Sequence, residues 1–215
     1  MMWIAAALLI FVFRSAFREP QLVPRGLANL LEAIIVFLRD EVILPNTSAA
    51  GRPYLPYLLT VFFFILFCNL LGLIPFCATA TGNVSVTAAL ALMSLVMIQV
   101  GGIREHGWKH HALNLVPHGI PTWLLPIMIP VEIMGQFTKP FALCIRLFAN
   151  MTAGHIVILA FISMIFILKS LLIAPVSVFF ALFISLLELF VAFLQAYIFT
   201  MLTALFMGMS IHPQH

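Results

Sequence analysis

Long apolar runs, separated by short polar or turn-rich stretches, dominate the pattern along this chain of 215 residues. The clearest run is Tyr57 to Pro75, YLLTVFFFILFCNLLGLIP, and a second, Val84 to Gly101, follows a short uncharged loop. A helix needs roughly 20 apolar residues to cross the hydrocarbon core of a bilayer, because it rises ~1.5 Å per residue. The pattern therefore predicts a membrane hairpin with arms at residues 54–75 and 84–103.

Two shorter apolar runs precede this hairpin. The run over residues 1–18 ends at arginines such as Arg14. We expect a first membrane helix there, with its basic end in the cytoplasm by the positive-inside rule. The run over residues 24–40 is too short to span and carries Glu32 among its apolar residues. It predicts an amphipathic helix lying on the cytoplasmic surface of the membrane.

The last two runs, at residues 121–169 and 173–211, are too long for upright spans. A continuous helix over the first would be roughly 60–75 Å long, about twice the ~30 Å thickness of the hydrocarbon core. Pro126, Pro130 and Pro140 permit bends in it, because each removes a backbone donor. We therefore predict a long, strongly tilted hairpin, with the N-terminus of the chain outside and the C-terminus inside.

Composition turns this pattern into a fold class. Hydrophobic residues make up 64% of the chain and charged residues only 8%, with a mean hydropathy of +1.18. Soluble domains carry about 25% charged residues, and strands of a membrane barrel would alternate apolar and polar positions. The sequence predicts an all-α integral membrane protein, a single transmembrane domain over residues 1–215 with about five membrane helices and one interfacial helix.

Charge and cysteine content exclude several functions. The net charge of +3 comes from scattered residues without the basic cluster that nucleic-acid binding requires. The three cysteines are odd in number and lack metal-type spacing, which argues against a disulfide framework and a zinc site. His106 and His110, with Glu105 beside them, are compatible with a metal site, but we favour a solvated cytoplasmic loop. We predict no cofactor and no bound metal.

Polar residues inside the membrane are concentrated in the long hairpin. Arg146 stands in the middle of its first arm, where an arginine costs roughly 2.5–3.5 kcal/mol to insert. Helical geometry places Asn150 about 40° from Arg146 and His155 about 180° away. Arg146 and Asn150 should therefore share one face of the helix, while His155 should point to another.

Antiparallel arms that turn near residue 171 would bring specific residues to the same level. His155 would then lie opposite Glu188, and Arg146 opposite Gln195. Histidine and carboxylate side chains can both exchange protons, so the first pair predicts a proton relay toward the outside. The alternative is a hydrogen-bonded cluster, including Ser185 on the second arm, that only holds the helices together.

Four segments of the chain resemble one family closely. They are IRLFANMTAGHIV (Ile145 to Val157), LELFVAFLQAYIFTMLT (Leu187 to Thr203), NLLGLIP (Asn69 to Pro75) and MIPVEIMGQFTKPFAL (Met128 to Leu143). These four segments resemble subunit a of F-type ATP synthases. The match extends over nearly the whole chain and is weakest before Pro53.

This resemblance implies a stator beside a rotating c-type ring of hairpin subunits, each with a buried carboxylate. It also implies two offset aqueous half-channels, peripheral-stalk b-type subunits as further partners, and membership of the ATP synthase complex without catalysis by this chain itself. Arg146 would be the arginine that faces the ring, with Gln195 and Asn150 beside it. The resemblance implies a proton path through His155, Glu188, Asn69 and Glu132. We add the polar residue Ser185 to this predicted path.

Two other functions compete with the stator. A secondary cation transporter would carry a polar site at mid-membrane, but such folds usually contain two related halves, and we find no repeat. A structural anchor would use its polar residues only to join helices. We favour protons over sodium because His155 and Glu188 suit proton exchange. The bacterial inner membrane is the expected location, since the chain lacks a transit-type leader, and a mitochondrial or other organellar membrane is the alternative.

Overall fold

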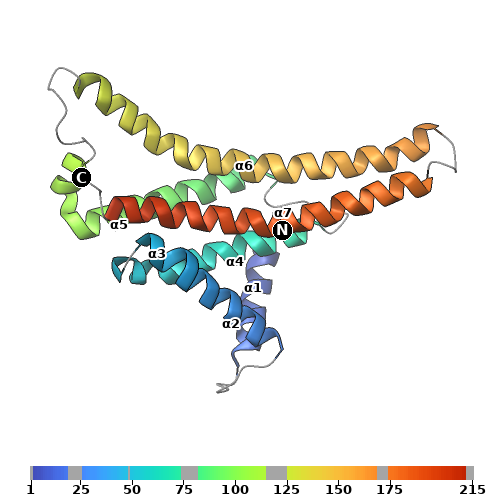
Figure 1. Cartoon of the computed structure of the whole chain (residues 1–215), viewed down its shortest axis with the longest axis horizontal. Helices are drawn as coiled ribbons and strands as arrows, with labels where there is room; N and C mark the ends of the chain where they lie inside the picture. The colour runs from blue at the N-terminus through green and yellow to red at the C-terminus, as the bar shows by residue number, and fades with distance from the viewer. Residues whose placement is uncertain are drawn as a thin grey trace.

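The protein is helical throughout its regular structure, as the computed structural model shows (Figure 1). Within the described residues there is no strand, so the predicted all-α class is confirmed. The structure describes residues 2–18, 26–47, 49–73, 82–114, 125–168 and 174–211.

Helix α1 runs over Met2–Ala16 and is shorter than a membrane span. Its 15 residues correspond to about 22 Å, against the ~30 Å of a hydrocarbon core. It packs against α4, where the rings of Phe13 and Phe63 meet edge to face at 4.9 Å between centroids. The first membrane helix expected at residues 1–18 therefore remains a prediction.

We keep the name interfacial segment for the stretch predicted at residues 24–40, which is longer and less regular in the structure. Helix α2, Leu27–Phe37, continues into a π-helical stretch, η1, at Leu38–Ile43. The short helix α3, Leu44–Thr47, and a 3₁₀ turn, η2, at Ala49–Tyr54 then lead into the next span. Figure 1 shows these elements as the blue part of the chain, beside α1 and α4.

The first membrane hairpin consists of α4, Leu55–Gly72, and α5, Val84–Asn114. Helix α5 extends beyond residue 103, where the sequence pattern predicted its end. It is broken at Gly107, whose φ of 74° lies in the left-handed region that glycine adopts without steric cost. The helical segment before this break is therefore the part available to cross a membrane.

The long hairpin is formed by α6, Leu125–Leu168, and α7, Ala174–Ile211. With 44 and 38 residues, the two helices are about 66 Å and 57 Å long. Figure 1 shows them side by side, converging toward the end of α6 and the start of α7. The expected start of the first arm, residues 121–124, lies outside the described residues.

The main core lies where α4 packs against the second half of α7. Phe62 and Phe199 belong to one buried cluster, and Leu58 and Met207 to another. Helices in a membrane associate through close packing of this kind, since lipid is as apolar as the side chains. Four segments of the described chain are long and apolar enough to cross a membrane: Gly51–Gly72, Val84–Gly107, Cys144–Ile165 and Ala174–Ile211.

Candidate functional site

One face of α7 carries the buried polar residues of the long hairpin. Glu188, Ala192 and Gln195 are spaced by four and three residues, which places them on the same side of a helix. Glu188 is 6% exposed and Gln195 is 4% exposed. Together with Asn69, Asn150 and His155, these two residues form a group that we call the polar seam.

Across from this face, α6 presents His155 to Glu188. The distance from His155 Nε2 to Glu188 Oε1 is 3.9 Å, which is an ion-pair distance when the imidazole is protonated. The imidazole is about one-third exposed, whereas the carboxylate is buried. The structure thus brings together the two residues that helix-level arithmetic paired.

Gly154 makes the approach of Glu188 to α6 possible. A Cβ atom at this position would lie 2.6 Å from Glu188 Oε1 and 2.8 Å from its Cδ, closer than real Cβ contacts. The carboxylate therefore rests against the backbone of α6 where a side chain is missing. Sequence reasoning missed this residue, although its position next to His155 and opposite Glu188 was a usable signal.

A second contact between α6 and α7 joins two amides. Asn150 Nδ2 donates a hydrogen bond to Gln195 Oε1 at 3.0 Å. The sequence placed Arg146 opposite Gln195, and the structure instead gives Asn150, one turn further along α6, as the partner of the Gln195 oxygen. This bond fixes the orientation of the Gln195 amide inside the interface.

Arg146 lies on the exposed surface of α6. Among the described residues it forms no hydrogen bond or ion pair. It is one turn before Asn150, and ideal helical geometry places it about 180° from His155. Asn150 and His155, which were expected on different faces, both contact α7. The cationic group is therefore presented outward from the hairpin, next to the Asn150–Gln195 contact.

Asn69 connects α4 to the same face of α7. Its Nδ2 donates to the carbonyl oxygen of Ala192 at 3.1 Å, and its side chain is fully buried. Ala192 lies one turn after Glu188, so this bond fixes the height of α4 relative to the His155–Glu188 pair. Sequence reasoning placed Asn69 near the outer proton path without identifying its partner.

Four buried polar atoms in the seam have no hydrogen-bond partner within the described chain. A buried acceptor or donor without a partner costs roughly 1–3 kcal/mol, and such atoms are rare in native proteins. Their concentration in one place distinguishes the polar seam from the rest of the described interior. The atoms are Asn69 Oδ1, His155 Nε2, Glu188 Oε1 and Glu188 Oε2.

Two further predicted site residues are Ser185 and Glu132. Ser185 is half-buried, and its hydroxyl donates to the carbonyl of Ala181 in the same helix at 3.0 Å. Glu132 belongs to α6, but its side chain lies outside the described residues. The roles of both residues in a proton path therefore remain predictions.

The segment around His106 and His110, which we predicted to be a solvated loop, is part of helix α5. His106 Nε2 donates to the carbonyl oxygen of Ile211 at 2.7 Å and so binds the last turn of α7. The side chain of His110 lies outside the described residues. Within the part of the chain that the structure describes, no group of three or more potential ligands could hold a metal ion.

Two contacts that sequence reasoning did not identify connect α5 to its neighbours. The Thr87 hydroxyl lies 3.3 Å from Cys144 Sγ on α6, and the Tyr57 hydroxyl lies 3.3 Å from Ser94 Oγ. Both are polar contacts between neighbouring helices. They hold α5 against α6 and α4 respectively.

Comparison with known proteins gives a consistent result. The family model for the ATP synthase A chain matches residues 1–208. The chain is 51% identical to the ATP synthase subunit a of Chloroherpeton thalassium and 54% identical to that of Myxococcus xanthus, in both cases over its whole length. It is 52% identical, over 98% of its length, to ATP synthase subunit a 2 of Chlorobaculum tepidum. The chain spans 66%, 72% and 61% of the lengths of these three relatives.

Proposed function

The chain belongs to the ATP synthase A chain family, and on this basis we propose that it is the proton-conducting stator subunit of an ATP synthase membrane sector. It provides two offset half-channels and a fixed arginine that acts on the carboxylates of a rotor ring. The observation that carries the proposal is the separation of two groups on α6: Arg146 exposed on one side, and His155 paired with buried Glu188 on another.

Arg146 acts as an electrostatic switch for the ring. A guanidinium remains cationic at physiological pH, and in a low-dielectric environment it favours the ionised form of a carboxyl group that approaches it. A ring carboxyl arriving at Arg146 therefore releases its proton toward one half-channel. The same positive charge blocks a proton from passing directly between the half-channels.

The His155–Glu188 pair is the exchange site of the outer half-channel. Histidine changes its protonation between pH 5 and 8, and intramembrane carboxylates commonly mark proton relays. The 3.9 Å separation places the two groups close enough to pass a proton through one small movement or one bridging molecule. Asn69 Oδ1, which is buried and has no hydrogen-bond partner among the described residues, offers a hydrogen-bond acceptor between this pair and α4.

The Asn150–Gln195 bond separates the arginine from the outer pair. Gln195 lies two turns after Glu188 on α7, and its amide oxygen is already occupied by Asn150. Because the Gln195 amide is held in one orientation, its dipole beside Arg146 does not change while the ring moves past. Glu132 would serve the inner half-channel, and Ser185 would contribute to the outer one.

The driving force and the partners follow from this role. The membrane potential supplies about 2.3 kcal/mol per elementary charge for each 100 mV, and repeated steps rotate the ring. ATP synthesis takes place in a separate catalytic head, so this chain is a non-catalytic subunit. Its partners are the c-type ring, the b-type peripheral stalk and the rest of the complex, in the inner membrane of a bacterium.

Replacing Arg146 tests the central role. In complete ATP synthase reconstituted in vesicles, R146A should reduce ATP-driven proton pumping by about 100-fold or more, because losing about 3 kcal/mol of charge stabilisation corresponds to that factor. The matched control R14A removes an exposed arginine from α1 and should leave pumping unchanged. Coupled pumping by R146A at the control rate, with equal assembly, would contradict the proposal.

A second variant tests the outer half-channel. Glu188→Gln keeps the size of the side chain and removes its ability to carry a proton as a carboxylate. Passive proton conductance through the membrane sector should fall, while the amount of assembled complex stays equal to wild type. Unchanged conductance would rule out Glu188 as part of the path and leave Arg146 to be judged separately.

A further inference from the structure

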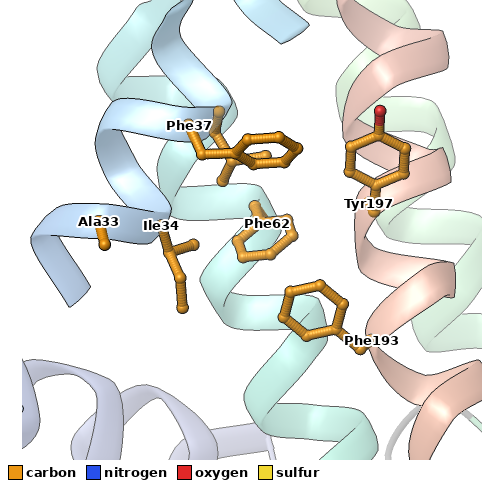
Figure 2. Close-up of a pocket in the computed structure, with 7 residues that line it drawn as sticks. Ala33, Ile34, Phe37, Phe62, Phe193 and Tyr197 are labelled. Atoms are coloured by element: carbon orange, nitrogen blue, oxygen red, sulfur yellow. The ribbon is translucent and has the colours of Figure 1, made fainter. Parts of the chain in front are cut away.

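An apolar groove lies between the interfacial helix α2 and the two spans α4 and α7 (Figure 2). Its volume is about 210 Å³. Figure 2 shows side chains from three helices around it, with α2 forming one wall and α7 the opposite wall. The residues that line it are Ala33, Ile34, Phe37, Leu38, Phe62, Phe193 and Tyr197.

The chemistry of the lining favours an apolar occupant. The groove could hold about seven water molecules at ~30 Å³ each, but its walls are aliphatic and aromatic except for the Tyr197 hydroxyl. Cavities lined in this way stay dry and bind small apolar groups. The volume is below the 300–1,000 Å³ of pockets for drug-sized ligands, so it fits part of an alkyl chain better than a whole small molecule.

The groove has one polar end and one apolar end. The rings of Phe37 and Tyr197 stack at 6.2 Å between centroids at one end, and the Tyr197 hydroxyl points away from Phe193 at the other (Figure 2). Directly after Phe37 and Leu38 comes the exposed pair of Arg39 and Asp40, joined at 2.7 Å.

This polarity matches a phospholipid. Arg39 and Asp40 are both charged at neutral pH, and the hydrogen bond from the Arg39 guanidinium lowers the pKa of the Asp40 carboxyl further. A tyrosine with one end apolar and one end in a polar layer is typical of the membrane interface. If an acyl chain lay in the groove, the charged pair of Arg39 and Asp40 would therefore be next to the headgroup of the lipid, and the rest of the chain would contact apolar side chains.

The groove is continuous with the outer surface of the chain. Phe37 is 48% exposed and Phe193 is 42% exposed, so the rim of the groove is open rather than sealed. The neighbouring surface carries further exposed apolar residues, including Leu30 on α2 and Phe190 on α7. In a membrane protein such a surface faces lipid, so an acyl chain can enter the groove from the bilayer without crossing water.

From these observations we propose that the groove is a lipid-binding site, occupied by part of the acyl chain of a bilayer phospholipid. The bound chain fills the space between the interfacial helix and the spans, and it contacts Ile34 and Tyr197 on opposite walls. The site is distinct from the proton path, since none of its lining residues belongs to the polar seam. Its role is to add lipid contacts between α2, α4 and α7 to the direct side-chain packing of Leu31 and Phe37.

Photo-crosslinking in the assembled complex tests this site. The complete ATP synthase is reconstituted in vesicles of phosphatidylcholine that carry a photoactivatable group in the acyl chain. After illumination, labelled residues are mapped by mass spectrometry. We expect label at Ile34 and Tyr197 in the groove, expressed as a ratio to label at Phe190, which is 62% exposed and outside the groove.

Two variants on α2 distinguish groove occupancy from general contact with lipid. A33W places an indole in the groove and should lower the groove-to-Phe190 ratio about tenfold, the change that corresponds to losing 1.4 kcal/mol of affinity. L30W adds the same side chain at an exposed position that does not line the groove and should leave the ratio unchanged.

Three outcomes would overturn the proposal. Label at Phe190 without label at Ile34 or Tyr197 would show an empty groove. Equal ratios for A33W and L30W would show that the label does not come from the groove. Label in the isolated chain that disappears in the assembled complex would show that a protein partner occupies the groove. Because proton pumping is not the readout, the result is independent of the proposed stator function.

Discussion

The two halves of α7 differ sharply in how they are packed. Over residues 192–211 half of the positions, at the i, i+3, i+4 spacing of one helix face, are buried, and α7 contacts α4, α5 and the short helix α3. Over residues 174–191 the described part of the chain covers only Ser177 and Glu188 to the same degree, and bulky residues such as Phe179 and Phe190 are exposed. One continuous helix therefore combines a structural half and an open half.

The polar seam lies where the packed half and the open half of α7 meet. Glu188 and Gln195 lie on either side of the change from the open half to the packed half. The packed half fixes the position of the helix, so the seam is held at a constant height. The open half leaves apolar surface free for lipid or a neighbouring subunit, and Arg146 on α6 is exposed in the same way.

The largest expected effect on stability comes from removing a ring in the packed half. F199A should lower the free energy of unfolding by about 3 kcal/mol, because it leaves a cavity in the core. F190A, nine residues earlier and 62% exposed, should change it by less than about 0.5 kcal/mol. Denaturant titration of both variants in detergent measures the difference. Equal losses would show that the two halves are packed alike.

A smaller effect is expected at Gly208, where the packed half meets the interfacial segment. A Cβ atom there would collide with the carbonyl oxygen of Asn46, so G208A should destabilise the protein by about 1–3 kcal/mol through overpacking. At Gly101 an added Cβ would make ordinary contacts of 3.7 Å with Met207 and Tyr54. G101A is therefore the control, and a thermal unfolding midpoint lowered equally in both would contradict this account.

At the seam, the expected effect is on activity more than on stability. G154A should displace the Glu188 carboxylate from its contact with α6 and reduce proton pumping about tenfold, equivalent to about 1.4 kcal/mol in the barrier. At Gly135 on the same helix, an added Cβ would meet no atom of the described residues within 4 Å, so G135A should pump normally. Normal pumping by G154A would mean that the close approach of Glu188 is not needed.

The smallest effect is expected for Ser185 in the open half. Its hydroxyl is bonded within its own helix, so S185A should change stability by less than about 0.5 kcal/mol. Proton conductance of the membrane sector should fall only slightly if Ser185 contributes to the outer path. A loss as large as that of E188Q would move Ser185 into the centre of the proton path.

The sequence predicted the helices well because each depends on local hydrophobicity and length. It also predicted that His155 and Glu188 would meet, since helical rise and a short turn determine the level of each residue. Gln195 shows the limit of this reasoning. The height of a residue along the hairpin identifies the residues near it, but the rotation of each helix about its axis determines that Asn150 is the hydrogen-bond partner. Counting residues along two helices does not specify how the helices are rotated relative to each other.

Other features depended on contacts between distant parts of the chain. The bond from Asn69 to the Ala192 carbonyl joins residues 123 positions apart, and no local pattern encodes it. The groove beside Phe62 requires three helices at once. The irregular segment over residues 38–54 was hard to predict because its π-helical and 3₁₀ turns follow from packing on α7 rather than from residue propensity.

The contact between Gly208 and Asn46 has a mechanical consequence. A rotor that turns against a stator exerts a sideways load on it, and a helix anchored only by flexible side chains would yield under that load. Here backbone rests on backbone, with no side chain between them to deform. Under the proposed stator role, this contact would make the end of α7 a rigid stop, and a sideways load on the long hairpin would pass into the backbone at Asn46.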